Sequence, residues 1–336
     1  MPRIYSEYSC SSESTIDDFR LLLGGVCVDP IDKGILWDMR TDCRQSYQSL
    51  ARKYGLTANA IRGRIDRLIK SGIIEGFQVV PSLTMMMADF VIALVTPDGS
   101  HNPDELIEKI GQHPMVLQLA YMTNNDCFVY GEYSGTSGLH KLGAYLRGID
   151  GVSAVQLHPL ITERGGRLEL KNHHLLVLKE LRDDARMSVA EIATRTGLTA
   201  RRVRSAIADF TESDAIRFSI QWALNAGGSN AFFVFTSWDE EKTNLQGIEE
   251  WLSTKFPEDY WLSFVSAVEP LIISIFVVPH LSQSAAIQRE VRSAPFVIEA
   301  RTLLVFPSRK FQGLRHDYLD TVLAGIGEDM GAEKRD

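Results

Sequence analysis

The chain has 336 residues, a formal net charge of −8 and 45% hydrophobic residues. This length exceeds one average domain and predicts two to four domains. No apolar run approaches the roughly 20 residues that a membrane span needs, and no secretory signal pattern is present, so we expect a cytoplasmic protein with no membrane partner. The four cysteines form no CxxC pair, which argues against a disulfide framework or a zinc site.

Residues 1–29 form an N-terminal extension in this interpretation. Met1–Ser14 is rich in serine and poor in apolar residues, so we expect it to be mobile. Ile16–Leu23 favours a short helix.

A winged helix-turn-helix unit is predicted over residues 30–82. Gly55 is suited to end one helix in the left-handed conformation, and the Thr57 hydroxyl is suited to cap the next. Apolar residues recur at helical spacing after Thr57. The expected elements are helices over Ile31–Met39, Ser46–Tyr54 and a third ending near Ser71, with Ile61, Ile65 and Leu68 inward, then a strand over Ile73–Val80.

Residues 83–163 predict a ferredoxin-like domain with the order β-α-β-β-α-β. Its expected elements are Asp89–Val95, Pro103–His113, Val116–Met122, Cys127–Tyr133, Ser137–Arg147 and Ser153–Leu160. Residues 164–169 follow, where Gly165 and Gly166 indicate a hinge that leaves the orientation of the two halves variable.

The second half repeats the first. Residues 177–216 align with residues 35–74 without a gap, with about 14 identities in 40 positions. A second winged helix-turn-helix unit is therefore expected over 170–224, with Val203, Ile207 and Phe210 inward, and a second ferredoxin-like domain over 225–309. Residues 310–336 predict an amphipathic helix over Leu314–Leu323 and a disordered tail from Glu328. The fold class is α+β.

The arrangement resembles the Lrp/AsnC family of bacterial and archaeal transcription regulators. The strongest likeness is SYQSLARKYGLTANAIRGRIDRLIKSGIIEGF, which begins at Ser46. Family members usually carry one such unit per chain, so this chain resembles a tandem duplication. The resemblance implies DNA binding, dimerisation through the ferredoxin-like part, and often the sensing of a small molecule such as an amino acid.

Local charge supports double-stranded DNA as the partner despite the acidic total. Residues 31–80 hold nine Lys+Arg against five Asp+Glu, and residues 170–222 hold nine against seven. Positive charge therefore gathers on the helix-turn-helix units. The candidate DNA-binding residues are Arg52, Lys53, Thr57, Asn59, Arg62, Arg64, Arg67 and Lys70 in the first unit, and Arg195, Arg201, Arg202, Arg204 and Ser205 in the second.

The two units differ along their third helices. Asn59 and Arg62 suit base edges, and Arg67 and Lys70 suit phosphates. The second unit has Asp209 and Glu212 where the first has Arg67 and Lys70. We therefore hypothesise that the first unit binds DNA more strongly and that the second reads only through its N-terminal arginines.

The hairpin loops of the ferredoxin-like domains are candidates for the effector site that the family resemblance implies. Thr123, Asn124, Asn125 and Asp126 form a polar loop in the first domain, where Asp126 suits an ammonium group; Glu269 is its counterpart in the second. The family often has a glycine before the acid, which this chain lacks. An ordinary polar turn is the alternative interpretation.

Two other functions stay open on the same architecture. Sirohaem decarboxylases resemble it, sometimes as two related halves, but the ferredoxin-like halves here are acidic and their histidines share no spacing. An adaptor that assembles with other regulators without binding DNA is the other alternative. We expect no enzyme activity, catalytic residue, cofactor or metal. The ferredoxin-like domains are expected to pair within the chain, and two chains to form a homodimer.

Overall fold

The computed structural model describes residues 28–223, 226 and 229–324. The helix expected at Ile16–Leu23, the expectation of mobility for Met1–Ser14 and the tail expected from Glu328 all fall outside the described residues. Among the described residues, no helix has both the length and the apolar character to cross a membrane. Cys43 and Cys127 are buried free thiols.

The first helix-turn-helix unit has the predicted three helices and strand. Asp29 and Asp32 form a capping box at the first helix, and Thr57 accepts a hydrogen bond from the Ala60 amide at the third. Gly55 ends the second helix with φ 67°. The elements are α2 (Pro30–Thr41), α3 (Tyr47–Tyr54), α4 (Ala58–Lys70) and β1 (Ile74–Pro81).

The second unit repeats this plan. Gly197 ends its second helix with φ 71°, and Thr199 caps its third by accepting from the Arg202 amide. Val203 and Phe210 are buried as expected, Ile207 is half-buried, and Ala206 completes the inward face. The elements are α8 (Asn172–Asp183), α9 (Val189–Thr196), α10 (Ala200–Glu212) and β6 (Ile216–Trp222).

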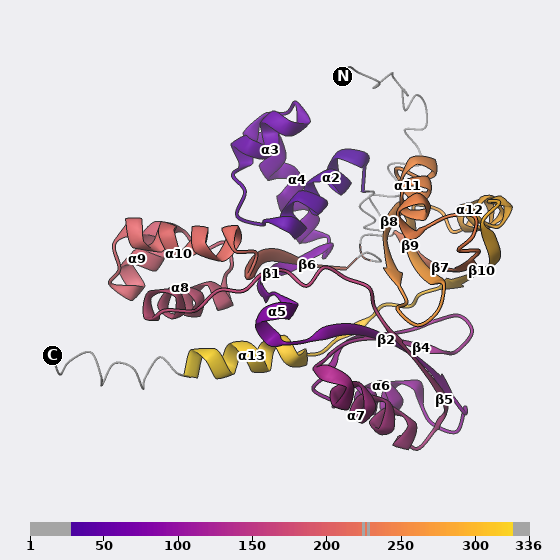
Figure 1. Ribbon diagram of the computed structural model, residues 1–336. Helices are drawn as coiled ribbons and strands as arrows, with labels where there is room; N and C mark the ends of the chain where they lie inside the picture. The colour runs from indigo at the N-terminus through magenta and orange to yellow at the C-terminus, as the bar shows by residue number, and fades with distance from the viewer. Residues whose placement is uncertain (1–27, 224–225, 227–228, 325–336) are drawn as a thin grey trace.

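The wings of the two units pair with each other. β1 and β6 form a two-stranded antiparallel sheet, with Phe77 opposite Ile220, and we call it the wing ribbon. Arg44 of the first unit donates to the carbonyl oxygens of Ala185 and Met187 of the second at 2.6 and 2.9 Å. The two units are therefore joined directly to each other, side by side on the left of Figure 1.

The first ferredoxin-like domain has a five-stranded sheet in the order β11-β3-β4-β2-β5. Its own elements are β2 (Asp89–Pro97), α6 (Pro103–Gly111), β3 (Val116–Tyr121), β4 (Cys127–Tyr133), α7 (Gly135–Gly148) and β5 (Val152–Pro159). The short helix α5 (Leu83–Met86), which the sequence analysis missed, connects it to β1.

The second ferredoxin-like domain has a four-stranded sheet in the order β10-β7-β9-β8. Its elements are β7 (Asn230–Trp238), α11 (Leu245–Lys255), β8 (Tyr260–Val265), β9 (Leu271–Val278), α12 (Ser282–Ser293) and β10 (Val297–Leu304). Both domains therefore have the β-α-β-β-α-β order that the sequence predicted.

The two sheets pack face to face inside the chain, with each helical layer on the outside (Figure 1). The ring centroids of Phe128 in β4 and Phe233 in β7 lie 4.6 Å apart in the shared core. The β3–β4 hairpin of the first domain also pairs with the segment that follows β10 of the second domain, through Met122 and Val305. The β8–β9 hairpin of the second domain pairs with the segment that follows β5 of the first domain, through Ser266 and Leu160. The domains thus form the expected pseudo-dimer.

The C-terminal segment returns to the first domain. The strand β11 (Arg309–Lys310) extends the first sheet beside β3, and the helix predicted over Leu314–Leu323 is present as α13 (Gly313–Ala324), although its apolar residues do not gather on one face. Arg315 forms an ion pair with Glu132, whose side chain is fully buried. Because a buried carboxylate needs a cationic partner, this pair fixes α13 on the sheet.

The glycines at the predicted hinge lie in close contact with the second unit. Gly165 has φ 67°, and the Gly166 amide donates to the Asp214 carbonyl oxygen at 2.9 Å. A Cβ on Gly166 would lie 1.8 Å from the Ser213 carbonyl oxygen. Close backbone approach therefore requires these glycines, and the hinge function stays a prediction.

Candidate nucleic-acid interface

The helix α4 presents the outward face that its spacing predicted. Ile61, Ile65 and Leu68 are buried against α2 and α3. Asn59, Arg62, Gly63 and Asp66 are exposed. Arg62 and Asp66 lie one helical turn apart, with 3.8 Å between Arg62 Nε and Asp66 Oδ2, so this exposed pair neutralises Arg62 only weakly.

Two arginines of α4 are bound to the fully buried carboxylate of Asp32 in α2. Arg64 Nη1 lies 2.8 Å from Asp32 Oδ1 and 2.6 Å from Asp29 Oδ2, and Arg67 pairs with Asp32 Oδ2. Asp32 has no exposed side-chain area. Arg64 and Arg67, both candidates for DNA contact, therefore hold the first and third helices together, so part of their charge is already neutralised.

The other predicted DNA-binding residues of the first unit fall into two groups, those whose side chains already bind another group of the protein and those whose charges are exposed. Lys53 Nζ lies 2.5 Å from Asp38 Oδ1, and the Thr57 hydroxyl is engaged as the cap of α4. Arg52 and Lys70 are exposed and form no ion pair with any described residue. The continuous basic face expected along α4 is therefore reduced to Lys70 and the loosely paired Arg62, with Arg52 exposed on the neighbouring α3.

In the second unit, the exposed charged side chains at the start of the third helix, α10, are all basic. Arg201, Arg202, Arg204 and Ser205 are exposed at the N-terminal half of α10. None of these three arginines forms an ion pair within the described part of the chain. Arg195 is engaged instead, at 2.6 Å from Glu191 and 3.4 Å from Glu180. A helix N-terminus also favours anions, so this surface suits phosphate.

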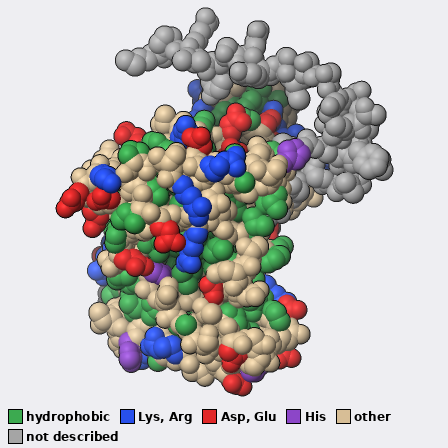
Figure 2. Space-filling model, turned by 90° about the vertical axis from the view of Figure 1, so that its right-hand side faces the viewer, with side chains coloured by type: hydrophobic (Ala, Val, Ile, Leu, Met, Phe, Trp, Pro, Cys, Tyr) green, Lys and Arg blue, Asp and Glu red, His purple; other side chains and the backbone are tan. Residues whose placement is uncertain are grey.

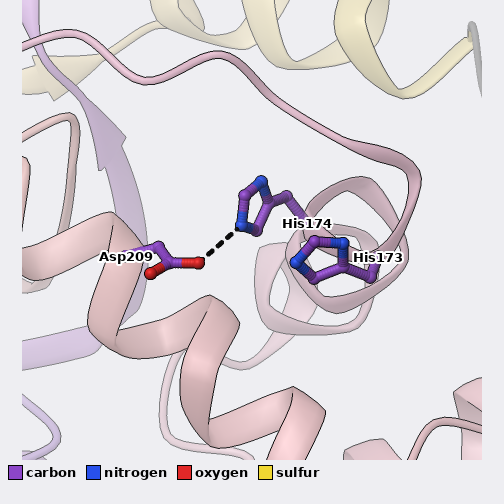
Figure 3. A group of neighbouring side chains, drawn as sticks. All are labelled: His173, His174 and Asp209. Atoms are coloured by element: carbon purple, nitrogen blue, oxygen red, sulfur yellow. Dashed lines mark hydrogen bonds and ion pairs between the residues drawn. The ribbon is translucent and has the colours of Figure 1, made fainter.

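The acids expected to repel phosphate on α10 differ from each other in their contacts. His174 is buried at the start of α8, and its Nε2 lies 3.0 Å from Asp209 Oδ2 (Figure 3). Asp209 is half-buried by this contact, whereas Glu212 is exposed. In the alignment of the two halves, His174 aligns with Asp32, and Asp209 aligns with Arg67. The two pairs therefore join equivalent positions, but the acidic partner lies on the first helix of the first unit and on the third helix of the second unit.

His173, His174 and Asp209 lie close enough together to be tested as a metal site. The Nδ1 atom of His174 accepts a hydrogen bond from the Lys171 amide at 3.1 Å. A ring that accepts at Nδ1 carries its proton on Nε2 and donates it to Asp209. Because His174 then has no free lone pair for a metal, the hydrogen bonds explain this cluster as a helix-joining contact.

The predicted ligand loop of the first domain satisfies its own polar groups. Asn124 Nδ2 donates to Asp126 Oδ2 at 2.6 Å, and the Asp126 amide donates to Asn124 Oδ1. Asn125 takes the left-handed conformation with φ 68°. Thr123 Oγ1 accepts from the Leu304 amide of the second domain. These bonds are those of a tight turn that also joins the domains, and they favour the alternative interpretation.

Glu269, the counterpart in the second domain, joins the two halves instead. One carboxylate oxygen lies 3.3 Å from His158 Nδ1 of β5. Burial lowers the pKa of His158, and the nearby Glu269 carboxylate opposes that shift. Glu269 also borders a surface groove between the β8–β9 hairpin and the start of α11, and ligand binding there stays a prediction.

The side of the molecule away from α8–α10 has a different surface. Figure 2 shows this side, on which acidic, basic and apolar side chains are mixed. The helix α10, which carries the exposed arginines, lies on the opposite side of the molecule (Figure 1). The arrangement is consistent with one side that faces phosphate.

Comparisons with known proteins agree with these units. The model of the winged helix-turn-helix DNA-binding family matches residues 28–75 and 170–217. An uncharacterized HTH-type transcriptional regulator of Pyrococcus horikoshii is 27% identical over 95 residues, which are 27% of this chain and 63% of the relative. The regulator Ptr1 of Methanocaldococcus jannaschii is 24% identical over 167 residues, which are 48% of this chain and 99% of Ptr1.

Among solved structures, the siroheme decarboxylase NirDL is similar over 90% of this chain and 100% of its own, with a TM-score of 0.55 and 12% identity. At this identity the likeness concerns the fold, which includes both helix-turn-helix units and both ferredoxin-like domains.

Proposed function

We propose that this chain, which carries two winged helix-turn-helix DNA-binding domains in a tandem Lrp/AsnC-like arrangement, is a sequence-specific transcription regulator. The observation that carries the proposal is the pair of matched units, each of which has exposed arginine in the first half of its third helix: Arg62 in the first unit, and Arg201, Arg202 and Arg204 in the second. Arginines at this position suit guanine edges and phosphates in a major groove. The relatives named as transcriptional regulators support the same assignment.

The decarboxylase alternative has less support. The fold is shared by both classes, so the fold does not decide between them. The cavity between the two ferredoxin-like sheets measures about 180 Å³, which is below the roughly 300–1,000 Å³ of pockets for drug-sized ligands. A tetrapyrrole is larger than those ligands. Among the described residues that line this cavity, Arg40 is the only basic one and none is a histidine.

The pseudo-dimer supports a particular assembly on DNA. One chain presents two linked units, so two chains in a homodimer would present four. Such an assembly would favour palindromic or repeated sites. Selection of bound duplexes from a random pool, followed by mapping of bound sites across the genome, tests sequence specificity and site spacing together. Binding without sequence preference would contradict the proposal.

The contribution of each unit is tested with matched arginines. Arg62 of α4 and Arg204 of α10 occupy equivalent positions in the two units. We expect R62A to weaken DNA binding about tenfold, as for one arginine contact. We expect the double variant R201A/R204A to weaken it at least as much, because no described acid neutralises these arginines. This reverses the ranking that the sequence alone suggested.

The measurement is the dissociation constant for a selected duplex over a series of salt concentrations. Arg289 is an exposed arginine on α12 in the second ferredoxin-like domain, so R289A is the control and should bind as the wild type does. A larger loss in R62A than in R201A/R204A would restore the first unit as the main reader. Unchanged affinity in both would contradict DNA binding through these helices.

A further inference from the structure

A cavity of about 180 Å³ lies between the two ferredoxin-like sheets and beside the wing ribbon. Aromatic side chains from both domains line it, among them Phe128, Phe233 and Phe264. Arg40 from the last turn of α2 and Trp222 from the end of β6 also line it. The cavity therefore touches both ferredoxin-like domains and both helix-turn-helix units.

Arg40 is a half-buried cation that packs on aromatic rings. Its guanidinium lies over the rings of Trp37 and Trp222, 5.1 and 5.5 Å from their centroids. No carboxylate among the described residues forms an ion pair with it. Burial lowers the pKa of Arg40, which reflects the cost of holding a charge away from water. Cation–π contacts offset part of that cost, and a half-buried charge without a counter-ion among the described residues invites an anion.

Tyr130 adds an unused hydrogen-bond donor to the same cavity. Its hydroxyl makes no hydrogen bond with a described residue, although its ring stacks on Phe90 with centroids 5.1 Å apart. Burial raises the pKa of Tyr130, while the neighbouring charges of Arg315 and Arg40 oppose that rise. The phenol is therefore protonated near neutral pH and is able to donate to an oxyanion close to Arg40.

We propose that this cavity binds a small organic acid with a single aromatic ring. The Arg40 guanidinium would pair with the carboxylate, the Tyr130 hydroxyl would donate to it, and the ring would pack among Phe128, Phe233 and Phe264. A cavity of about 150 Å³ with apolar walls is known to hold benzene, so about 180 Å³ fits one ring with a short acidic arm. This site is separate from the hairpin loops around Asp126 and Glu269.

The position of the cavity gives the ligand a route to the DNA-binding units, and this part rests on the proposed function. The Arg40 carbonyl oxygen accepts a hydrogen bond from Ser219 of β6 at 2.8 Å. Trp222 stacks edge-on against Trp37 of α2, with centroids 5.6 Å apart. A ligand that draws Arg40 toward the cavity would change the contact between α2 and the wing ribbon. Ligand binding in the cavity would thereby be coupled to DNA binding by the helix-turn-helix units.

Tryptophan fluorescence provides the first test, without DNA. Trp37, Trp222 and Trp261 form one cluster beside the cavity and are three of the five tryptophans. Full-length protein is titrated with benzoate, phenylacetate and 3-phenylpropanoate, and with the neutral phenylacetamide as the matched control ligand. We expect saturable binding of at least one acid and at least tenfold weaker binding of the amide. No saturable binding at millimolar acid, or equal binding of phenylacetamide, would overturn the proposal.

Variants locate the site. We expect R40L to weaken the acid at least tenfold, R40K to retain part of the affinity, and Y130F to weaken it about two- to tenfold, as for one lost hydrogen bond. The surface variant R289L should bind as the wild type does, and thermal melting checks that each variant is folded. Wild-type affinity in folded R40L would overturn the assignment.

DNA affinity with and without the acid then tests the coupling separately. A protein that binds the acid but no DNA would contradict the proposed function and leave the cavity site intact. A protein that binds DNA but none of the acids would contradict only the cavity site. Equal DNA affinity with and without saturating acid would overturn the coupling.

Discussion

The two helix-turn-helix units join their first and third helices by a polar pair at the same position, but with opposite polarity. In the first unit a fully buried carboxylate, Asp32, pairs with Arg64 and Arg67. In the second unit a buried imidazole, His174, pairs with Asp209. Arg67 follows Asp32 by 35 residues, and Asp209 follows His174 by the same 35 residues. Both units therefore have this contact, but the acidic partner lies on the first helix in one unit and on the third helix in the other.

This difference changes how the charge of each unit should be counted. The first unit has the larger net positive charge, but two of its arginines are partly neutralised inside the unit. The second unit has the smaller net charge, yet one of its acids is used in the same internal contact and its helix-start arginines stay free. Net charge counted along the sequence includes both partners of each internal pair, so it does not show which cations are free to contact phosphate.

The largest expected effect separates structure from DNA contact in the first unit. The double variant R64A/R67A would leave the Asp32 carboxylate buried without a cationic partner. We expect this to lower the free energy of unfolding by about 3 kcal/mol, as for a broken buried ion pair. Urea unfolding followed by circular dichroism measures the change.

The matched control is R52A/K70A, which removes two exposed charges from the same unit without touching an ion pair of the described residues. We expect it to change stability by less than about 0.5 kcal/mol, as is usual for surface substitutions. If the two double variants lower the free energy of unfolding equally, the ion pair of Asp32 contributes no more to stability than exposed charges do.

Much of the fold follows from local patterns in the sequence. The gap-free repeat, the glycines Gly55 and Gly197, and the caps Thr57 and Thr199 predicted both units, because helix ends depend on a few neighbouring residues. The pairing of β1 with β6 and the strand β11 were missed. These contacts join residues far apart in the chain, and no local spacing indicates them.

The candidate interface was predictable in part. Helical spacing placed Asn59 and Arg62 on the exposed face, as the structure shows. It did not show that Arg64 and Arg67 contact Asp32, because that contact depends on the packing of two helices. A signal was present in the repeat: Asp32 aligns with His174, and Arg67 with Asp209. Opposite changes at two aligned positions indicate a contact between them.

A smaller effect is expected from exchanging the polarity of the second pair. H174D alone places two carboxylates together, and D209R alone removes the acceptor for His174. We expect each to lower the free energy of unfolding by about 1–2 kcal/mol. The double variant H174D/D209R recreates the polarity of the first unit and should recover about 1 kcal/mol of the summed loss.

The control for this cycle is E212K, which introduces the residue found at the aligned position Lys70. Glu212 is exposed and forms no ion pair among the described residues, so E212K should leave stability almost unchanged. Strictly additive losses in H174D and D209R would show that the two positions are not equivalent to Asp32 and Arg67.

The smallest expected effect is a pH dependence that the second unit has and the first unit lacks, because residues 28–81 contain no histidine. Burial lowers the pKa of His173, and the neighbouring His174 and Arg202 lower it further. As the pH falls through about 6.5, the unfolded chain takes up a proton that the folded unit resists. The free energy of unfolding contributed by His173 is therefore present above this pH and declines below it.

Urea unfolding between pH 7.5 and 5.5 should consequently show a shallower loss of stability in H173N than in the wild type. Burial also lowers the pKa of His113 and His158, so part of the slope should remain. His140 is exposed on α7, and H140N serves as the matched control with an unchanged slope. If H173N and the wild type lose stability in parallel, the second unit carries no pH dependence of its own, and its difference from the first unit lies only in the polarity of the helix-joining pair.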